Sequence, residues 1–416
     1  MDTTWASSNN MDRSGVAVRM RNRTRTSTAG RKVSQLTKAS HQICSGLLFA
    51  TCSGQASSCL RHIALNTSRL KAAFRGAYVW QSSLIFVCKK VLTQVPSYSM
   101  NKGHPDVIVV GAGISGITAA RKLQSYGHVV EVIEKGRGVG GRMATRRFAG
   151  ATFDHGAQFF TSRGSDFTEL IETASQQGAV KKWTNGFSDD PDGYTRWCGS
   201  SGMTSLVKWM VAEANINVRT TTTVKDLRDM PSSGYVLTAP IPQCLAILSF
   251  SQMLPNPRTH IQLSSISYKP TIAVLLRLDQ SPSLFPDHGG IQFLDHPDLA
   301  FISDNQRKGV SDEPAVTIHL SNILSESLWD HSDLEVLAAT SALVEDHLSG
   351  AGVTDYQIQR WRYAGPADVW AEPTLAWGSK PTIALAGEAF AGPKVEGAFR
   401  SGLAAAEKIN ISLSSP

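Results

Sequence analysis

Short apolar runs alternate with amphipathic segments of helical period along the chain after residue 100. The β-branched runs at 106–110 and 129–133 are typical of buried parallel strands, and the segment 117–126 between them predicts a helix. The same pattern recurs further on and predicts strands at 218–224, 235–239 and 382–386 and helices at 201–214 and 399–409. Strands that alternate with helices predict an α/β fold with a mainly parallel sheet.

A second group of strands is predicted between residues 270 and 363. The runs at 270–279, 299–303, 315–321 and 356–363 have the composition of strands in an antiparallel sheet. Ser332 and Glu335 form a capping box for a helix that continues through Leu348 and stops at Gly350. We expect the apolar side chains of this helix to be core positions, namely Leu334, Leu337, Val344 and Leu348.

Glycines at a characteristic spacing follow the first predicted strand, in the sequence Gly111-Ala-Gly113-Ile-Ser-Gly116. Gly111 permits a tight turn, Gly113 lets the backbone approach a pyrophosphate, and Gly116 lets the helix pack closely on the strand. The N-terminus of that helix offers unpaired N–H groups to phosphates. Glu134 follows the second strand, where a carboxylate can accept hydrogen bonds from ribose hydroxyls, which favours NAD or FAD over NADP. The pattern predicts a dinucleotide site.

A second glycine motif separates FAD from NAD. Gly140, Gly141 and Arg142 follow the second strand, where paired glycines admit a diphosphate and Arg142 can neutralise it. An ordinary NAD dehydrogenase has no use for this second phosphate clamp. Gly156 and Ala157 come shortly afterwards and are small enough for the backbone to pass close to a flat ring system.

These motifs resemble the renalase-like branch of the flavin amine oxidase superfamily, together with the run Asp154-His-Gly-Ala-Gln-Phe-Phe-Thr161 and the C-terminal segment 387–401. The resemblance covers residues 106 to about 409 and implies a glutathione-reductase-like FAD domain that binds FAD non-covalently. It places Val224 beside adenine and Glu388 near the ribityl or diphosphate region, and it directs the N-terminus of the last helix at the flavin pyrimidine ring. The motifs and the resemblance together give the candidate cofactor-binding residues Gly111, Gly113, Ile114, Ser115, Gly116, Glu134, Lys135, Gly141, Arg142, Gly156, Ala157, Gln158, Val224, Gly387, Glu388, Val395, Glu396, Gly397 and Ala398.

The fold expected is therefore α/β, with an FAD-binding Rossmann-like domain and an antiparallel-sheet substrate domain. We assign 101–165, 200–245 and 380–416 to the first domain and 166–199 and 246–379 to the second. The segment 225–234 is shorter than the meander that relatives carry between the corresponding strands. We therefore expect one face of the parallel sheet to lack a cover and to expose apolar surface.

The first 100 residues differ in composition from the rest. They hold 14 Lys and Arg against two acidic residues, which leaves the remainder of the chain with a net charge of −5. They also hold 24 Ser and Thr. The overall charge of +7 thus belongs to this leader, which argues against a nucleic-acid-binding protein. A basic, Ser-rich, acid-poor leader is typical of an organelle transit peptide, and its many hydroxyl residues favour a plastid over a mitochondrion. The alternatives are a disordered tail of a cytoplasmic protein, or translation that starts at Met100.

Other classes of protein receive no support. No run of 18 apolar residues predicts a membrane span. Four of the six cysteines lie in the leader, and only Cys198 and Cys244 follow it, in no spacing that suggests a disulfide scaffold or a metal site. We therefore expect no metal.

Candidates for the substrate face are Gln158, Asn305 and Trp361, which lie at or beside the ends of predicted strands. A plain structural role is open for each, as a core aromatic for Trp361 and as a turn residue for Asn305. No Ser-His-Asp triad or paired-carboxylate motif stands out, which agrees with a reaction in which the cofactor supplies the chemistry.

If the resemblance extends to activity, the substrate is a small dihydropyridine, an isomer of NAD(P)H with its hydride at the wrong ring carbon. Hydride would pass to the flavin, and O₂ would reoxidise it. One alternative is a flavin amine oxidase or carotenoid desaturase relative. Another is a non-catalytic or destabilised flavoprotein, suggested by the short 225–234 segment, and an NAD-dependent dehydrogenase ranks last.

Overall fold

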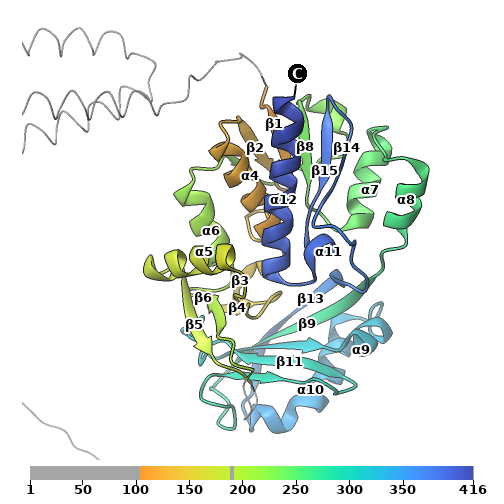
Figure 1. Ribbon diagram of the computed structural model, residues 1–416. Helices are drawn as coiled ribbons and strands as arrows, with labels where there is room; N and C mark the ends of the chain where they lie inside the picture. Colours follow the sequence, from red (N-terminus) through yellow and green to blue (C-terminus); the bar gives the residue numbers. More distant parts are fainter. Residues whose placement is uncertain (1–103, 188–191, 416) are drawn as a thin grey trace, which may run out of the picture. The chain divides into compact units, whose positions relative to one another are not determined.

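The computed structural model describes residues 104–187 and 192–415, which form two lobes, one built on a mainly parallel sheet and one on an antiparallel sheet (Figure 1). The predicted leader and its four cysteines lie outside these residues. The parallel-sheet lobe has six strands in the order β14 (Leu375–Trp377), β15 (Thr382–Leu385), β8 (Gly234–Leu237), β1 (Val107–Val110), β2 (Val130–Ile133) and β7 (Val218–Arg219). All neighbours pair in parallel except β14 and β15. The α/β prediction is confirmed.

Two long helices cover one face of the parallel sheet, α4 (Ile114–Ser125) and α12 (Val395–Ser414). They pack closely because a Cβ on Gly402 would lie 2.3 Å from the carbonyl oxygen of Ser115. The apolar core beneath them also takes in α5 (Ser165–Gln176) and α6 (Thr204–Glu213). The ring of Phe167 on α5 lies 5.0 Å from that of Phe399 on α12. Helix α5, which we assigned to the substrate domain, thus packs on the parallel-sheet lobe.

The other face of this sheet is also covered, contrary to the expectation from the short 225–234 segment. Helices α7 (Ile241–Phe250) and α8 (Pro257–Ser264) contribute Cys244, Leu248 and Leu263 to a core shared with β1, β8 and β15. The short connection itself forms a 3-10 turn, η2 (Leu227–Asp229). The Tyr235 hydroxyl donates hydrogen bonds from β8 to carbonyls of this connection. Helices α7 and α8 thus cover the face of the sheet that the expected meander would have covered.

The predicted strand at 218–224 is shorter than expected. Only Val218 and Arg219 pair with β2. Thr221 has a φ of 53°, and the amides of Thr221 and Thr222 donate to the carbonyls of Gly136 and Glu134 instead of continuing the ladder. Residues 220–224 therefore leave the sheet edge and run along the loop after β2.

The second lobe is a five-stranded antiparallel sheet in the order β10 (Gly290–Gln292), β11 (Leu299–Asp304), β12 (Ala315–Leu320), β9 (Tyr268–Leu278) and β13 (Val353–Pro366). Helices α9 (Asn322–Ser327) and α10 (Asp333–Leu348) cover its outer face. The capping box of Ser332 and Glu335 is present at the start of α10. Val344 and Leu348 are buried as expected, whereas Leu334 is 66% exposed and Val336 takes the core position in its place.

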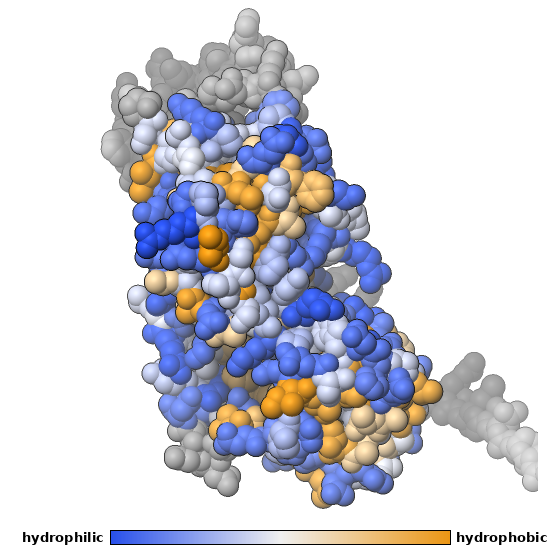
Figure 2. Space-filling view, turned by 90° about the vertical axis from the view of Figure 1, so that its right-hand side faces the viewer, coloured by the Kyte–Doolittle hydropathy of each residue, from blue (hydrophilic) through white to orange (hydrophobic). Residues whose placement is uncertain are grey.

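Two hairpins and two short helical turns lie where the lobes meet: β3 (Thr145–Phe148) with β4 (Ala151–Asp154), β5 (Val180–Thr184) with β6 (Arg196–Gly199), η1 (Gly141–Met143) and α11 (Glu388–Ala391). Within the described ranges no helix is long and apolar enough to cross a membrane. The surface is mostly hydrophilic on the face drawn in Figure 2, with apolar side chains in separate patches.

Helix α7 offers a test of the inserted cover. Leu248 is fully buried against the sheet, whereas Phe250, two residues later, is 70% exposed. We expect Leu248→Ala to lower the free energy of unfolding by about 2–5 kcal/mol, because it removes buried methyl groups and leaves a cavity. Phe250→Ala should change it by less than about 0.5 kcal/mol. Urea unfolding of residues 100–416 measures both, and equal effects would show that α7 does not pack on the sheet.

Candidate cofactor and substrate site

The glycine turn between β1 and α4 has the geometry that the motif predicts. Gly111 has a φ of +108°, and a Cβ on Gly116 would lie 2.0 Å from the Gly111 carbonyl oxygen, so the helix start and the strand end touch through backbone alone. A Cβ on Gly113 would meet nothing within 4 Å. Helix α4 has no side-chain cap. Its N-terminus therefore keeps N–H groups available for an anion at an open position.

Glu134 fixes the loop beside this turn. Its Oε2 accepts a hydrogen bond from the amide of Ala112 at 2.8 Å, and its Oε1 accepts one from the amide of Gly136 at 2.7 Å. Lys135 and Val224 line the same cavity. The carboxylate is thus held at the end of β2, where the sequence places it, with lone pairs left for a ligand hydroxyl.

Arg142 contacts Glu388 directly in the wall of the cavity. The guanidinium makes a two-pronged contact with that carboxylate, with Nη1 donating to Oε1 at 2.6 Å and Nη2 donating to Oε2. Nη1 also donates to the Tyr363 carbonyl on β13 at 3.1 Å. The side chains of Arg142 and Glu388 are 27% and 10% exposed. The sequence predicted both residues for the site but did not predict that each would be the other's partner.

The start of α12 opens on the same cavity. This helix also has no side-chain cap, and Val395, Glu396 and Ala398 from its first turn line the cavity. Behind it, the Ser401 hydroxyl accepts a hydrogen bond from the Gly387 amide at 2.8 Å. A Cβ on Gly397 would lie 2.3 Å from the Gly392 carbonyl oxygen, so this glycine serves close packing.

The cavity between these elements has a volume of about 1010 Å³, at the upper end of the range for small-molecule and cofactor sites. Among the residues that the structure describes, seven basic side chains line it against four acidic ones, a balance that favours an anionic ligand. It extends from the glycine turn to Thr271, His319 and Trp361 of the antiparallel sheet. Of the predicted cofactor residues it is lined by Gly111, Gly113, Ile114, Ser115, Glu134, Lys135, Gly141, Arg142, Gly156, Ala157, Val224, Glu388, Val395, Glu396 and Ala398.

Gly156 and Ala157 reach the cavity because they lie directly on the backbone of Arg142. The Ala157 amide donates to the Arg142 carbonyl at 2.9 Å. A Cβ on Gly156 would lie 2.0 Å from the same oxygen, so a larger residue would force the two segments apart.

Two of the three substrate-face candidates lie behind the cavity wall instead of in it. Gln158 is 5% exposed, and its amide nitrogen donates to the carbonyls of Asp154 and Gly156. Asn305 is completely buried and bonds to Thr317 and to the Asp154 amide. Both side chains bond to buried backbone, although the Gln158 Oε1 atom finds no hydrogen-bond partner among the described residues.

Trp361 does line the cavity, and two histidines, His155 and His319, belong to the same part of the site. Its indole N–H donates to the His155 carbonyl at 2.7 Å, and its ring stacks on the His155 ring at 5.3 Å. His319 on β12 also lines the cavity and contacts the amide nitrogen of Gln158 at 3.4 Å. Burial lowers the pKa of both histidines to about 4, so both are neutral near pH 7.

His319 was not predicted from the sequence, although the alternation of side chains along its strand could have indicated it. Along β12 the side chains of Val316, Ile318 and Leu320 enter the core under the helices. Since side chains alternate across a strand, His319 must face the opposite side, toward the other lobe.

Comparisons with known proteins agree with this geometry. Residues 109–174 match the family described as NAD(P)-binding Rossmann-like domain. The flavin-dependent L-tryptophan oxidase RebO of Lentzea aerocolonigenes is 31% identical over 118 residues, which is 27% of this chain and 25% of that protein. Polyamine oxidase 7 of Oryza sativa subsp. japonica is 41% identical over 69 residues, 16% of this chain and 15% of the relative. The chain thus matches a quarter or less of the length of these relatives.

Solved structures share the fold over a longer range. Cyclohexylamine oxidase from Brevibacterium oxydans IH-35A has a TM-score of 0.55 at 15% identity, covering 75% of this chain and 100% of that one. A triple mutant of putrescine oxidase has a TM-score of 0.57 at 16% identity, covering 75% and 99%. The fold and site define a Rossmann-like dinucleotide-binding protein with an antiparallel-sheet lobe. The family match and the relatives concern a minor part of the chain, whereas the solved structures of the two oxidases share its fold over three quarters of its length.

The two histidines predict a loss of stability in mild acid. Their pKa of about 4 in the folded protein lies below the ordinary value of 6.5, so folding disfavours their protonated forms. The contribution of the two neutral histidines to the free energy of unfolding is fully present above pH 6.5. It is lost as the pH falls toward 4, which lowers the free energy of unfolding by about 1–3 kcal/mol. Urea unfolding at several pH values measures it. His319→Asn should flatten the dependence of the unfolding free energy on pH, whereas His104→Asn, at an exposed position, should not. Identical curves for the unaltered protein and both variants would contradict a role of the buried histidines in this dependence.

Proposed function

We propose that the protein is an FAD-dependent oxidoreductase that acts on a small anionic substrate. The observation that carries this proposal is the convergence of two uncapped helix N-termini, those of α4 and α12, on one cavity of about 1010 Å³. Each N-terminus favours negative charge. One suits a diphosphate and the other suits the electron-rich pyrimidine side of a flavin, and NAD alone would leave the second without a ligand.

The residues present fit FAD along its whole length. The open position at Gly113 leaves room for a diphosphate against the α4 amides. Glu134 would accept hydrogen bonds from the adenosine ribose, and Arg142 with Glu388 would meet the diphosphate and ribityl region. When bound, FAD would supply the acceptor for a hydride from the substrate, and we propose O₂ as the final electron acceptor. The chain's own task is then to hold the substrate ring, keep water out and supply fixed charge.

The charges favour a renalase-like substrate, a dihydropyridine isomer of NAD(P)H, over an amine. Arg163 and Arg196 line the cavity, and the Arg196 guanidinium lies 5.8 Å from the Phe159 ring centre. Arg196 is ion-paired with Asp192, so the attraction for the phosphates of a dinucleotide and the repulsion of an ammonium group would come mainly from Arg163. The flat face of Trp361 offers a stacking surface, and neutral His319 and His155 add no charge against it. Hydride transfer from such a ring needs no general base.

We also propose that FAD is bound without a covalent link. Cys198 is buried in the core under α4, and the Cys244 thiol donates to the Ala239 carbonyl within the core under α7. Burial raises the pKa of Cys244 to about 12, which keeps its thiol protonated and unreactive. Acid precipitation tests this proposal, because non-covalent flavin is released into the supernatant.

The absorption spectrum of purified residues 100–416 tests the function. We expect flavin bands that bleach when aged NADH, which contains misreduced isomers, is added without oxygen, and that return in air. Fresh NADH is the matched control and should bleach far less. A yellow protein that only amines bleach would contradict the substrate proposal, and a colourless, folded protein would contradict FAD binding.

Gly113 provides a sharper test of where the cofactor lies. Its φ of −74° is open to any residue, and a side chain there would project into empty space. We expect Gly113→Val to fold with nearly unchanged stability but to weaken FAD binding at least about 10-fold, through a clash worth 1.4 kcal/mol or more. Gly138→Val, in the neighbouring exposed loop with equal free space, is the control. Equal affinities, measured by flavin fluorescence, would place the diphosphate elsewhere.

We propose that the basic leader directs import into an organelle, a plastid ahead of a mitochondrion. Residues 1–100 fused to a fluorescent protein should enter plastids in plant cells, whereas the same fusion with the arginines at 19, 21, 23 and 25 changed to glutamine should not, because import depends on positive charge. Diffuse cytoplasmic fluorescence of the unaltered fusion would contradict the proposal.

A further inference from the structure

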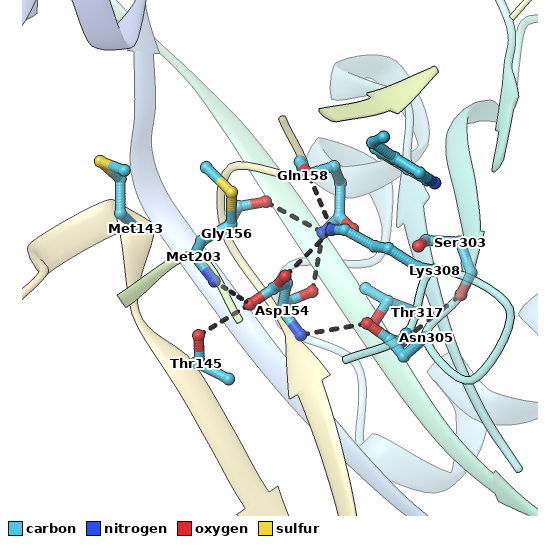
Figure 3. A network of polar contacts seen from close by, with 12 residues as sticks. Met143, Thr145, Asp154, Gly156, Gln158, Met203, Ser303, Asn305, Lys308 and Thr317 are labelled. Carbon is cyan, nitrogen blue, oxygen red and sulfur yellow. Dashed lines mark hydrogen bonds and ion pairs between the residues drawn. The ribbon is translucent and has the colours of Figure 1, made fainter. Parts of the chain in front are cut away.

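A lysine that no motif pointed to is fully buried between the two lobes. Lys308 lies in the loop between β11 and β12, and its side chain is 0% exposed. Its ammonium group donates to Asp154 Oδ2 at 2.9 Å and to the carbonyl of Gln158 at 2.6 Å, as Figure 3 shows. It also lies 4.5 Å from the centre of the Trp183 ring, an attractive cation–π distance.

Asp154, its partner, is equally buried and connects further elements. Its Oδ1 accepts from the Met203 amide at the start of α6 and from the Thr145 hydroxyl on β3, each at 2.7 Å. The Asp154 amide donates to the Asn305 side chain at 3.3 Å, which comes from the same loop as Lys308 (Figure 3). The carboxylate thus ties the β3–β4 hairpin to α6 and to the antiparallel-sheet lobe.

Lys308 binds both ends of one cavity-lining segment. Asp154 begins the segment and Gln158 ends it, and between them Gly156 and Ala157 form part of the cavity wall. The middle is held from the opposite side, by the bond from the Ala157 amide to the Arg142 carbonyl. The backbone of 154–158 is therefore fixed at three points, two of them through one ammonium group.

We propose that Lys308 is a positioning residue that fixes the cavity wall at Gly156 and Ala157 for the cofactor ring. Neutralising Asp154 does not by itself explain it, because a buried ion pair is often no more stabilising than apolar side chains of the same volume. The bond to the Gln158 carbonyl adds nothing to charge balance, but it sets the course of the backbone. The part of the proposal that concerns a ring ligand rests on the proposed FAD function; the ordering of the backbone does not.

The test separates position from stability with two variants. Lys308→Met leaves the Asp154 carboxylate buried without its counter-ion, so we expect a strongly destabilised protein. Lys308→Met with Asp154→Asn removes both charges and keeps an oxygen for the Met203 amide, so it should regain most of that stability. Neither variant can bind the Gln158 carbonyl.

Hydrogen exchange of the ligand-free double variant is the first readout. We expect the peptide covering 154–160 to exchange at least about 10-fold faster than in the unaltered protein, with other peptides unchanged. Leu276→Ala, in the core of the antiparallel sheet and away from the segment, is the control for a general loss of stability and should leave 154–160 protected relative to the rest. Unchanged exchange at 154–160 in the double variant overturns the proposal.

The affinity for FAD and the visible circular dichroism of bound flavin are the second readout. The double variant should bind FAD about 10-fold more weakly and show an altered dichroism band, whereas Leu276→Ala should retain both values. An unaltered protein that binds no FAD defeats the proposed function alone, since the exchange result still decides the role of Lys308. If the double variant binds FAD with unchanged affinity and unchanged dichroism, Lys308 does not position the cavity wall for the cofactor.

Discussion

The contact between α4 and α12 is the constraint from which the rest of the site follows. At Gly402 the two helices approach so closely that a single additional carbon would meet the Ser115 carbonyl at 2.3 Å. Because both helices lie on the same face of the parallel sheet, with their N-termini at the carboxyl ends of its strands, their electropositive ends meet at one cavity. Segments more than 280 residues apart in sequence thereby form one binding surface.

A charged pair links two walls of this cavity. Arg142 in η1 and Glu388 at the start of α11 join these two turns, and the Tyr363 carbonyl adds β13 of the other lobe. Such a pair costs desolvation, so it is a weak source of stability. Its value lies in direction, because a two-pronged guanidinium–carboxylate contact allows few geometries.

Much of the site could be predicted from the sequence because its signals are local. Gly111, Gly113 and Gly116 form a turn whose steric requirement lies within six residues, and the structure shows it. Long-range partners carry no such signal. Nothing next to Arg142 indicates Glu388, and nothing next to Asn305 indicates that its amide is consumed by Asp154 and Thr317.

The predictions about burial were wrong where contacts between segments distant in sequence determine which side chains are buried. Leu334 has the spacing of a core residue, but it lies in the first turn of α10, on the side away from the sheet, and Val336 is buried instead. The cover supplied by α7 and α8 was not predicted, because residues from 246 onward were assigned to the other domain. For Leu334 the predicted helix was correct and only its neighbour in space was unknown, whereas no helix was predicted for the segment that forms α7 and α8.

The long pair of strands β9 and β13 has a consequence for how the protein exchanges ligands. Their pairing runs from Leu278 opposite Val353, deep in the antiparallel sheet, to Tyr268 opposite Pro366, beside α7. Only Ser265, Ile266 and Ser267 separate α8 from β9. This ribbon, whose register shifts between Trp361 and Gly365, joins the two lobes directly, so we expect it to resist their opening. We therefore expect molecules to enter and leave through the mouth of the cavity, and the width of that opening then limits the size of the ligand.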